Sequence, residues 1–126
     1  MTANSVASVS LNPPLVSVGV DREADMHGTL LAAPAFVINI LSAGQEALSR
    51  RFAIPDGDKF EGVGFHRIEG GLVVLDGVLA HIECVRHAEV PAGDHTIFIG
   101  RVTGGSATEG HPLLYYRGGY GGRVQG

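Results

Sequence analysis

The chain has 126 residues, a formal charge of −4 at pH 7, 44% hydrophobic residues and 17% charged residues. This length fits one domain with a core of its own, and the composition is that of a folded soluble protein without a run apolar enough to cross a bilayer. Its nine Lys and Arg residues are too few for a duplex nucleic-acid binder, which must neutralise many phosphates.

Two strands are predicted at the beginning of the chain. In residues 7–11, apolar side chains alternate with Ser8 and Ser10, and this period of two predicts a strand with both serines on one face. Asn12-Pro13-Pro14 interrupts the strand, because proline has no amide to donate. Residues 15–20 then form a second, more buried strand, which charged residues end.

Two short helices are predicted around a third strand. Residues 26–33 fit two helical turns ended by a proline, and residues 35–41 form an apolar strand. Ser42 and Gln45 have the spacing of a capping box, in which each side chain bonds the backbone amide of the other residue. A helix therefore runs from this capping box to about Phe52.

The second half of the chain consists of predicted strands joined by turns. Apolar runs at 72–75 and 78–85 flank Asp76-Gly77, which predicts a hairpin because a type I′ turn favours Asp-Gly at its two central positions. The other segments are a surface loop at 53–64, a turn at 91–94, a strand at 97–102, a loose loop at 104–110, a strand at 113–116 and a frayed glycine-rich tail at 118–122. About seven strands and two short helices indicate a mainly β chain that forms a closed or nearly closed antiparallel barrel.

The general catalytic and metal-binding motifs are not present in the sequence. There is no glycine-rich phosphate loop ending in Lys-Ser or Lys-Thr, no HExxH and no GxGxxG after a strand. The six histidines are far apart, and His81 and His87, which share a predicted strand, are separated by about 20 Å. We therefore expect no metal site.

Cys84 is the only cysteine, so the chain has no intrachain disulfide and no cysteine-based zinc site. Its position in an apolar run predicts a buried thiol with a packing role. The opening residues 1–5 lack a basic stretch followed by an apolar one, so they do not resemble an export signal. We expect a cytoplasmic location.

Several short strings follow one another in the order found in a known family. They are the segment from Met1 to Val16 with Thr2-Ala3-Asn4-Ser5 and Ser8-Val9-Ser10, then Asn39-Ile40-Leu41, Arg51-Phe52-Ala53, Lys59-Phe60-Glu61-Gly62, Gly93-Asp94-His95-Thr96 and Leu114-Tyr115-Tyr116-Arg117-Gly118. Together they cover nearly the whole chain. On these strings the chain resembles the flavin reductase family, which has the FMN-binding split-barrel fold.

The resemblance implies an NAD(P)H:flavin oxidoreductase that reduces FMN or FAD with NADH or NADPH. It implies a homodimer that is the reductase component of a two-component system and supplies reduced flavin, by diffusion, to a separate monooxygenase. The cofactor site implied by the family consists of Thr2, Ala3, Asn4, Ser5, Ser8, Val9, Ser10, Arg22, Asn39, Phe60, Asp94, His95, Arg117 and Tyr120. Hydride transfer needs no acid or base from the protein, because the cofactors carry the chemistry.

His95 is the implied catalytic residue, either orienting the dinucleotide or donating to charge that builds on the flavin. Each implied role has a simpler alternative. His95 is otherwise a structural histidine beside a turn, and Ser8 and Ser10 are otherwise an exposed polar face. Phe60 is otherwise a packing residue, and Arg117 meets either a phosphate or a neighbouring carboxylate.

Two departures from the family pattern affect the expected function. The segment that begins here at Met1 usually follows a further strand, so we expect an N-terminally shortened domain over residues 1–126. Relatives commonly place Ser and Thr against the flavin phosphate where this chain has Glu23-Ala24-Asp25-Met26, and carboxylates there repel a phosphate. The alternatives are a split-barrel protein that binds flavin, haem or a deazaflavin without turnover, an inactive truncated homologue, or a dimer-forming structural domain.

Overall fold

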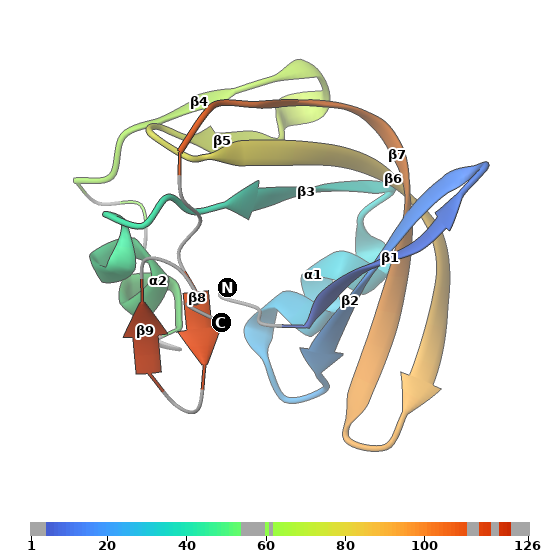
Figure 1. The fold of residues 1–126 in the computed structure, drawn as a ribbon. Helices are drawn as coiled ribbons and strands as arrows, with labels where there is room; N and C mark the ends of the chain where they lie inside the picture. Colours follow the sequence, from blue (N-terminus) through green and yellow to red (C-terminus); the bar gives the residue numbers. More distant parts are fainter. Residues whose placement is uncertain (1–4, 54–59, 61, 111–113, 117–118, 122–126) are drawn as a thin grey trace.

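A computed structural model describes residues 5–53, 60, 62–110, 114–116 and 119–121 (Figure 1). The elements in chain order are β1 (Val6–Leu11), β2 (Pro14–Asp21), α1 (Asp25–Ala32), β3 (Ala35–Ile40), α2 (Glu46–Ala53), β4 (Phe65–Arg67), a 3₁₀ turn (Glu69–Gly71), β5 (Val73–Leu75), β6 (Ala80–Ala92), β7 (His95–Ala107), β8 (Leu114–Tyr116) and β9 (Gly119–Gly121). The predicted mainly β class, with two short helices, is confirmed. Neither helix is long and apolar enough to span a membrane in the ranges described.

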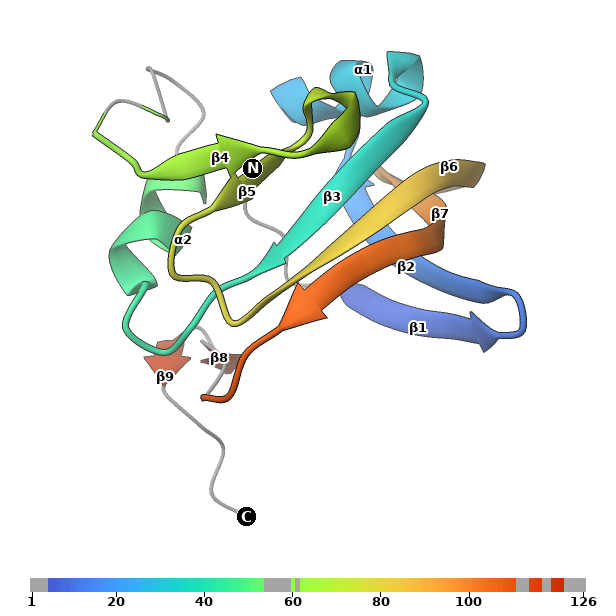
Figure 2. The same ribbon diagram turned by 90° about the horizontal axis from the view of Figure 1, so that it is seen from above.

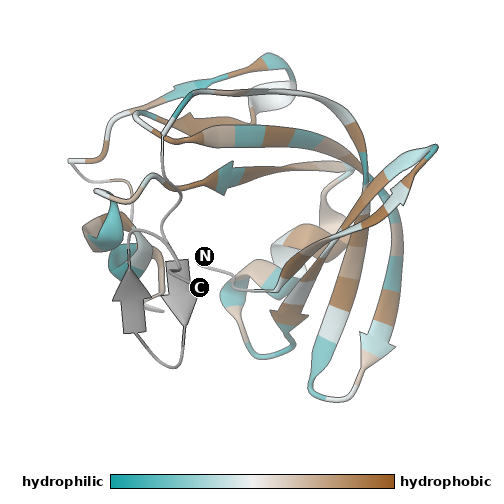
Figure 3. Cartoon of the chain, viewed as in Figure 1, coloured by the Kyte–Doolittle hydropathy of each residue, from teal (hydrophilic) through white to brown (hydrophobic). Residues whose placement is uncertain are grey.

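One curved antiparallel sheet organises the molecule. Its five strands lie in the order β1-β2-β7-β6-β3, and β4-β5 and β8-β9 form two further two-stranded sheets. Seen from above, β4 and β5 lie beside β3, and α2 lies at the same side of the molecule (Figure 2). Coloured by hydropathy, the strands of the main sheet show alternating bands, as expected when one face is buried (Figure 3).

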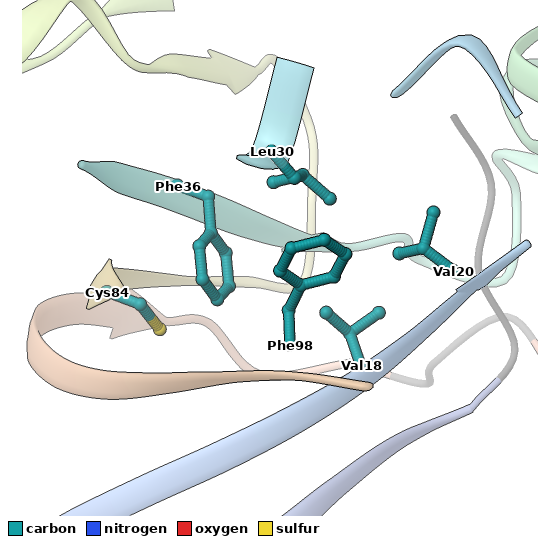
Figure 4. Packing of buried hydrophobic residues seen from close by; sticks show 6 residues of the cluster. All are labelled: Val18, Val20, Leu30, Phe36, Cys84 and Phe98. Atoms are coloured by element: carbon teal, nitrogen blue, oxygen red, sulfur yellow. The ribbon is translucent and has the colours of Figure 1, made fainter. Parts of the chain in front are cut away.

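The core lies between the main sheet and α1. It is formed by Val18, Val20, Leu30, Phe36, Cys84 and Phe98 (Figure 4). The predicted burial of the only thiol is confirmed, since Cys84 is 1% exposed, and this burial raises its pKa to about 11. Gly100 makes the packing possible, because a Cβ there would lie 2.5 Å from Cζ of Phe36 and 2.7 Å from Cβ of Cys84.

Polar side chains attach α1 to the sheet at both of its ends. Near its beginning, Nε2 of His27 is 2.8 Å from the hydroxyl of buried Thr96, and the ring meets Phe98 edge to face at 5.7 Å. At its end, the guanidinium of Arg86 donates to the carbonyl oxygens of Leu30 and Leu31. A cation at this end also offsets the partial negative charge of the helix C-terminus.

The hairpin predicted at Asp76-Gly77 is wrong, because the strands on its two sides belong to different sheets. β5 pairs with β4, whereas β6 pairs with β3 and β7. After the turn the chain pairs with the end of β3, where the amide of Leu79 donates to the carbonyl of Ile40 at 2.8 Å. Gly77 does have a positive φ of 75°, so the local turn signal was correct and only the pairing differs.

One of the two hydrogen bonds of the predicted capping box is present. The other is replaced by bonds from Ser42 and Gln45 to the turn after β5. Oε1 of Gln45 accepts from the amide of Ser42 at 2.9 Å, as predicted. The Ser42 hydroxyl instead donates to the carbonyl of Gly77, and Nε2 of Gln45 donates to the carbonyl of Asp76. These two bonds tie the turn after β5 to the start of α2.

Two glycine-rich segments predicted as irregular are strands. The predicted loose loop at 104–110 is paired in its first part, where Gly104 lies across from Glu83 and Gly105 across from Ile82. A Cβ on Gly105 would lie 2.3 Å from the carbonyl oxygen of His81, so glycine here permits close strand approach. The predicted frayed tail likewise contains β9, which pairs with β8.

A substitution at Gly100 tests the packing of the core. We expect Gly100→Ala to lower the free energy of unfolding by about 1–3 kcal/mol, because a methyl group has no room beneath Phe36 and Cys84. Gly28→Ala is the matched control, since nothing lies within 4 Å of a Cβ there and a helical alanine adds up to about 1 kcal/mol. Urea unfolding measures both, and equal stabilities would contradict the packing described.

Candidate functional site

Three predicted site residues meet where β2 ends and the β6–β7 hairpin turns. Asp21, the last residue of β2, lies directly across from His95, the first residue of β7. The amide of Arg22 then donates to the carbonyl of Asp94 at 3.0 Å. Arg22 therefore lies beside Asp94 and His95, although more than seventy positions separate it from them in the sequence.

Ser5 joins the same place from the beginning of the chain. Val6 pairs with Val18, so Ser5 lies beside Gly19, and its hydroxyl accepts from the Gly19 amide at 3.2 Å and lies 3.3 Å from the Gly19 carbonyl oxygen. A Cβ at position 19 would lie 2.9 Å from Oγ of Ser5 and 3.9 Å from Cδ2 of His95. Glycine therefore allows Ser5 and His95 to approach the same point of β2.

We call Ser5, Gly19, Arg22, Asp94 and His95 the corner cluster. Gly19 was not among the predicted site residues. Its signal in the sequence was a glycine inside an apolar strand, which often marks a close approach of another group.

Asp94 fixes the orientation of the His95 ring. Its Oδ1 lies 2.8 Å from Nδ1 of His95, and this hydrogen bond, the charge of the imidazole and the charge of Arg22 lower the pKa of the Asp94 carboxyl below its ordinary value of 3.8. Asp94 is therefore an ionised acceptor at neutral pH, so Nδ1 must carry the proton of this bond. Nε2 is then the ring nitrogen available for a ligand, on a side chain that is 46% exposed.

The predicted site residues on β1 do not all face one way. Ser8 pairs with Val16 and Ser10 pairs with Leu15, so the register shifts by one residue at Val9. Residues directly opposite each other share a face, and the two partners are adjacent in β2. The bulge therefore places Ser8 and Ser10 on opposite faces, and the prediction that they share one is wrong.

Asn39 and Phe60 lie away from the corner cluster. Asn39 Nδ2 donates to the carbonyl of Val73 at 3.1 Å, and its Oδ1 accepts from the amide of Leu75 at 2.9 Å. Its side chain thus replaces a strand along the edge of β5. Phe60 is 41% exposed and packs edge to face between Phe52 and Phe65, with ring centroids 5.3 and 5.2 Å away.

The remaining predicted site residues fall outside the description of side chains. Thr2, Ala3, Asn4 and Arg117 lie outside the described residues, and Tyr120 lies in β9, for which the pairing of the backbone is described.

Two cavities of the described part of the chain lie elsewhere. One of about 580 Å³ is lined by α2 residues and the segment before β4, and one of about 210 Å³ lies at the turn between β5 and β6. Neither is lined by a member of the corner cluster. The corner cluster therefore offers a ligand exposed polar groups rather than an enclosed volume.

A family model and several known proteins are similar to this chain over most of its length. The family model described as flavin reductase like domain matches residues 1–122. A flavin reductase from Pseudomonas putida is 42% identical over 97% of this chain and 72% of its own length, and an NADH-dependent FAD reductase from Streptomyces globisporus is 46% identical over 81% of this chain and 59% of its own. The chain spans about half, 52%, of the reductase subunit of stachydrine N-demethylase from Rhizobium meliloti.

Several solved structures have the same fold as this chain. The NADH:FAD oxidoreductase of Streptomyces globisporus C-1027, solved with fragments of NAD and FAD, superposes with a TM-score of 0.92 at 39% identity and covers 98% of this chain and 75% of its own. Nitrilotriacetate monooxygenase component B from Mycobacterium thermoresistibile gives a TM-score of 0.91 at 36% identity, covering 97% of this chain and 70% of its own. The expected split-barrel fold is confirmed.

The bridging role of Asn39 gives a stability test. We expect Asn39→Leu, which keeps the branched arrangement of heavy atoms, to lower the free energy of unfolding by about 2–4 kcal/mol, because it leaves the Val73 carbonyl and the Leu75 amide without their partner. Asn39→Asp keeps the acceptor for the Leu75 amide but turns an oxygen toward the Val73 carbonyl, so its loss should be smaller at low pH, where the protonated carboxyl can donate, than at neutral pH. Urea unfolding and hydrogen exchange of the Leu75 amide measure the effect, and an unchanged Asn39→Leu would show that the bridge contributes nothing.

Proposed function

The chain belongs to the flavin reductase-like domain family, and we propose that it reduces FMN or FAD with electrons from NADH or NADPH. The observation that carries this proposal is the family match over residues 1–122, together with the likeness to a relative solved with NAD and FAD fragments. Further relatives named as NADH-dependent flavin reductase and as NADH-dependent FMN reductase support the same activity.

The corner cluster has the groups that such a reaction needs from the protein. The hydride-transfer chemistry itself would be supplied by the flavin and the nicotinamide, and the protein would hold and orient them. His95 offers Nε2 to one of them, while Asp94 holds the ring by Nδ1. Arg22 adds positive charge next to it, which suits a phosphate or an electron-rich ring edge. Ser5 ties the chain that follows Thr2, Ala3 and Asn4 to the same point.

Acidic residues beside the corner cluster should weaken the binding of a flavin phosphate. Asp21, Glu23 and Asp25 are exposed at the end of β2 and the start of α1, and Oδ1 of Asp21 accepts from the amide of Glu23 at 2.9 Å. Carboxylates repel a phosphate group placed near them. We therefore propose that flavin is a substrate which leaves after reduction, rather than a permanently bound group.

A flavin that leaves needs a protein that uses it. Relatives include the reductase component of a flavin-dependent trigonelline monooxygenase and the flavin reductase component of a tryptophan halogenase. We propose a separate monooxygenase as the partner here, supplied by diffusion of reduced flavin, in the cytoplasm where reduced nicotinamide is formed.

We also propose a homodimer. β1 is an edge strand of the main sheet, and its Val6, Val9 and Leu11 are 41%, 52% and 89% exposed. An uncharged edge of this kind is usually covered by another strand or another chain.

The first test is direct measurement of flavin reduction. We expect the purified protein to oxidise NADH or NADPH in the presence of FMN or FAD, with loss of the absorbance of oxidised flavin under anaerobic conditions. His95→Ala should lower kcat/KM by about tenfold to a hundredfold, the equivalent of one hydrogen bond to a charged group. His87→Ala, an exposed histidine on β6, is the matched control. No reduction by the wild-type protein would refute the proposal, and an active His95→Ala would remove only the role of His95.

The second test concerns the acidic residues. We expect Glu23→Gln to tighten binding of FMN a few-fold at low salt, because removing one exposed charge near a phosphate is worth about 0.5–1 kcal/mol, and to do so less at high salt. Binding of riboflavin, which has no phosphate, should not change. Glu69→Gln, at an exposed position beside β5, is the control. Equal gains for FMN and riboflavin, measured by fluorescence quenching, would place the phosphate elsewhere.

A further inference from the structure

A second polar cluster lies at the other end of the β6–β7 pair. Ser106 lies directly across from His81, and Glu83 is two residues further along β6, so the three side chains share one face of the sheet. Oγ of Ser106 is 3.1 Å from Nδ1 of His81, and Nε2 of His81 is 3.0 Å from Oε2 of Glu83. Both ring nitrogens are therefore engaged, on a side chain that is 12% exposed.

The backbone around Glu83 leaves room for this arrangement. Gly104 lies across from Glu83, and a Cβ there would be 3.3 Å from Oε2 of the carboxylate. The hydroxyl of Thr103 donates to the Glu83 carbonyl at 3.3 Å and holds the same part of β6. A larger residue at position 104 would press on the carboxylate that meets His81.

The carboxylate determines which nitrogen of His81 carries the proton. An ionised carboxylate only accepts hydrogen bonds, so Nε2 of His81 must be the donor to Glu83. In the neutral ring Nδ1 then has the free electron pair, and the hydroxyl of Ser106 donates to it. A hydroxyl, an imidazole base and an orienting carboxylate in this order form the constellation that activates serine nucleophiles, here with the two ring nitrogens exchanged.

A small cavity adjoins the hydroxyl. Its volume is about 210 Å³, and His81 and Ser106 line it together with Val74, Leu75, Leu79 and Thr108. The aliphatic part of this lining suits a short hydrocarbon group, while Ser106 and Thr108, together with His66 and Asp76, supply polar atoms. The cavity is therefore large enough for a small acyl donor and too small for a flavin.

We propose that Ser106 is an activated nucleophile that accepts the acyl group of a small activated ester. In this step the bond from Oγ of Ser106 to the carbonyl carbon forms, and the bond from that carbon to the leaving oxygen breaks. The hydroxyl proton passes to Nδ1 of His81 and from there to the leaving group, so no oxidant or reductant takes part. Glu83 is a positioning residue that orients the ring and, in the neutral form, selects the tautomer with its proton on Nε2.

This site is separate from the corner cluster. Ser106 and His95 are eleven residues apart on β7, which corresponds to about 35 Å along the strand. Variants of Ser106 therefore leave flavin reduction unchanged, and this proposal does not depend on the proposed function.

The test uses p-nitrophenyl acetate and intact mass spectrometry. We expect a burst of about one p-nitrophenolate per chain and one acetyl adduct that maps to Ser106. Ser106→Ala should abolish the burst, and His81→Gln should slow it by about a hundredfold or more. Glu83→Gln should slow it less and change its pH profile, because the tautomer is no longer fixed. Ser17→Ala, a serine on β2 that belongs to neither polar cluster, is the matched control and should behave as the wild type.

Two outcomes overturn the proposal. One is an adduct that is spread over amines or persists in Ser106→Ala, which would show that the three residues form only a cross-strand hydrogen-bond network. The other is a wild-type protein that is not acylated although circular dichroism shows it to be folded. NADH-dependent flavin reduction measured on the same samples tests the proposed function separately.

Discussion

The pairing of β6 with β7 is the interaction on which the rest of the structure depends. Two strands of 13 residues run antiparallel from Ala80 opposite Ala107 to Ala92 opposite His95. β3 is added to one side of this pair, and β2 and then β1 to the other. Two register shifts, one with an extra residue in β7 and one with an extra residue in β6, let the pair bend, and the sheet curls around the core (Figure 1). The pair also carries a polar cluster at each end, with the apolar core between them.

Local patterns predicted most elements of the fold but not all of their partners. Alternation and proline placed β1, β2 and β3 within a residue or two, because these signals act within one strand. The pairing of β5 did not follow from Asp76-Gly77, since Asn39, far away in the sequence, supplies the bonds that hold the edge of β5. A turn motif describes its own backbone, whereas the choice of a neighbouring strand depends on side chains from elsewhere.

Part of the candidate site can be predicted from the sequence, because the family places these motifs around one site. Asp94 and His95 follow a glycine turn, and the sheet brings Arg22 and Ser5 to them. The bulge at Val9 was not predictable, because a shift of register leaves no mark on a strictly alternating sequence. The network around His81 is not predictable from the sequence either, because Ser106 lies in a glycine-rich segment typical of a loop and only the strand pairing brings it opposite His81.

Modification of Cys84 can be used to measure local opening of the sheet. It is the only thiol, it lies in the middle of the β6–β7 pair beneath Phe36, and burial raises its pKa to about 11. Because the thiolate is the form that reacts, alkylating reagents meet an inert group as long as the strands stay together. The rate at which the thiol is modified therefore reports the frequency of opening at this part of the sheet, and no label has to be introduced into the protein.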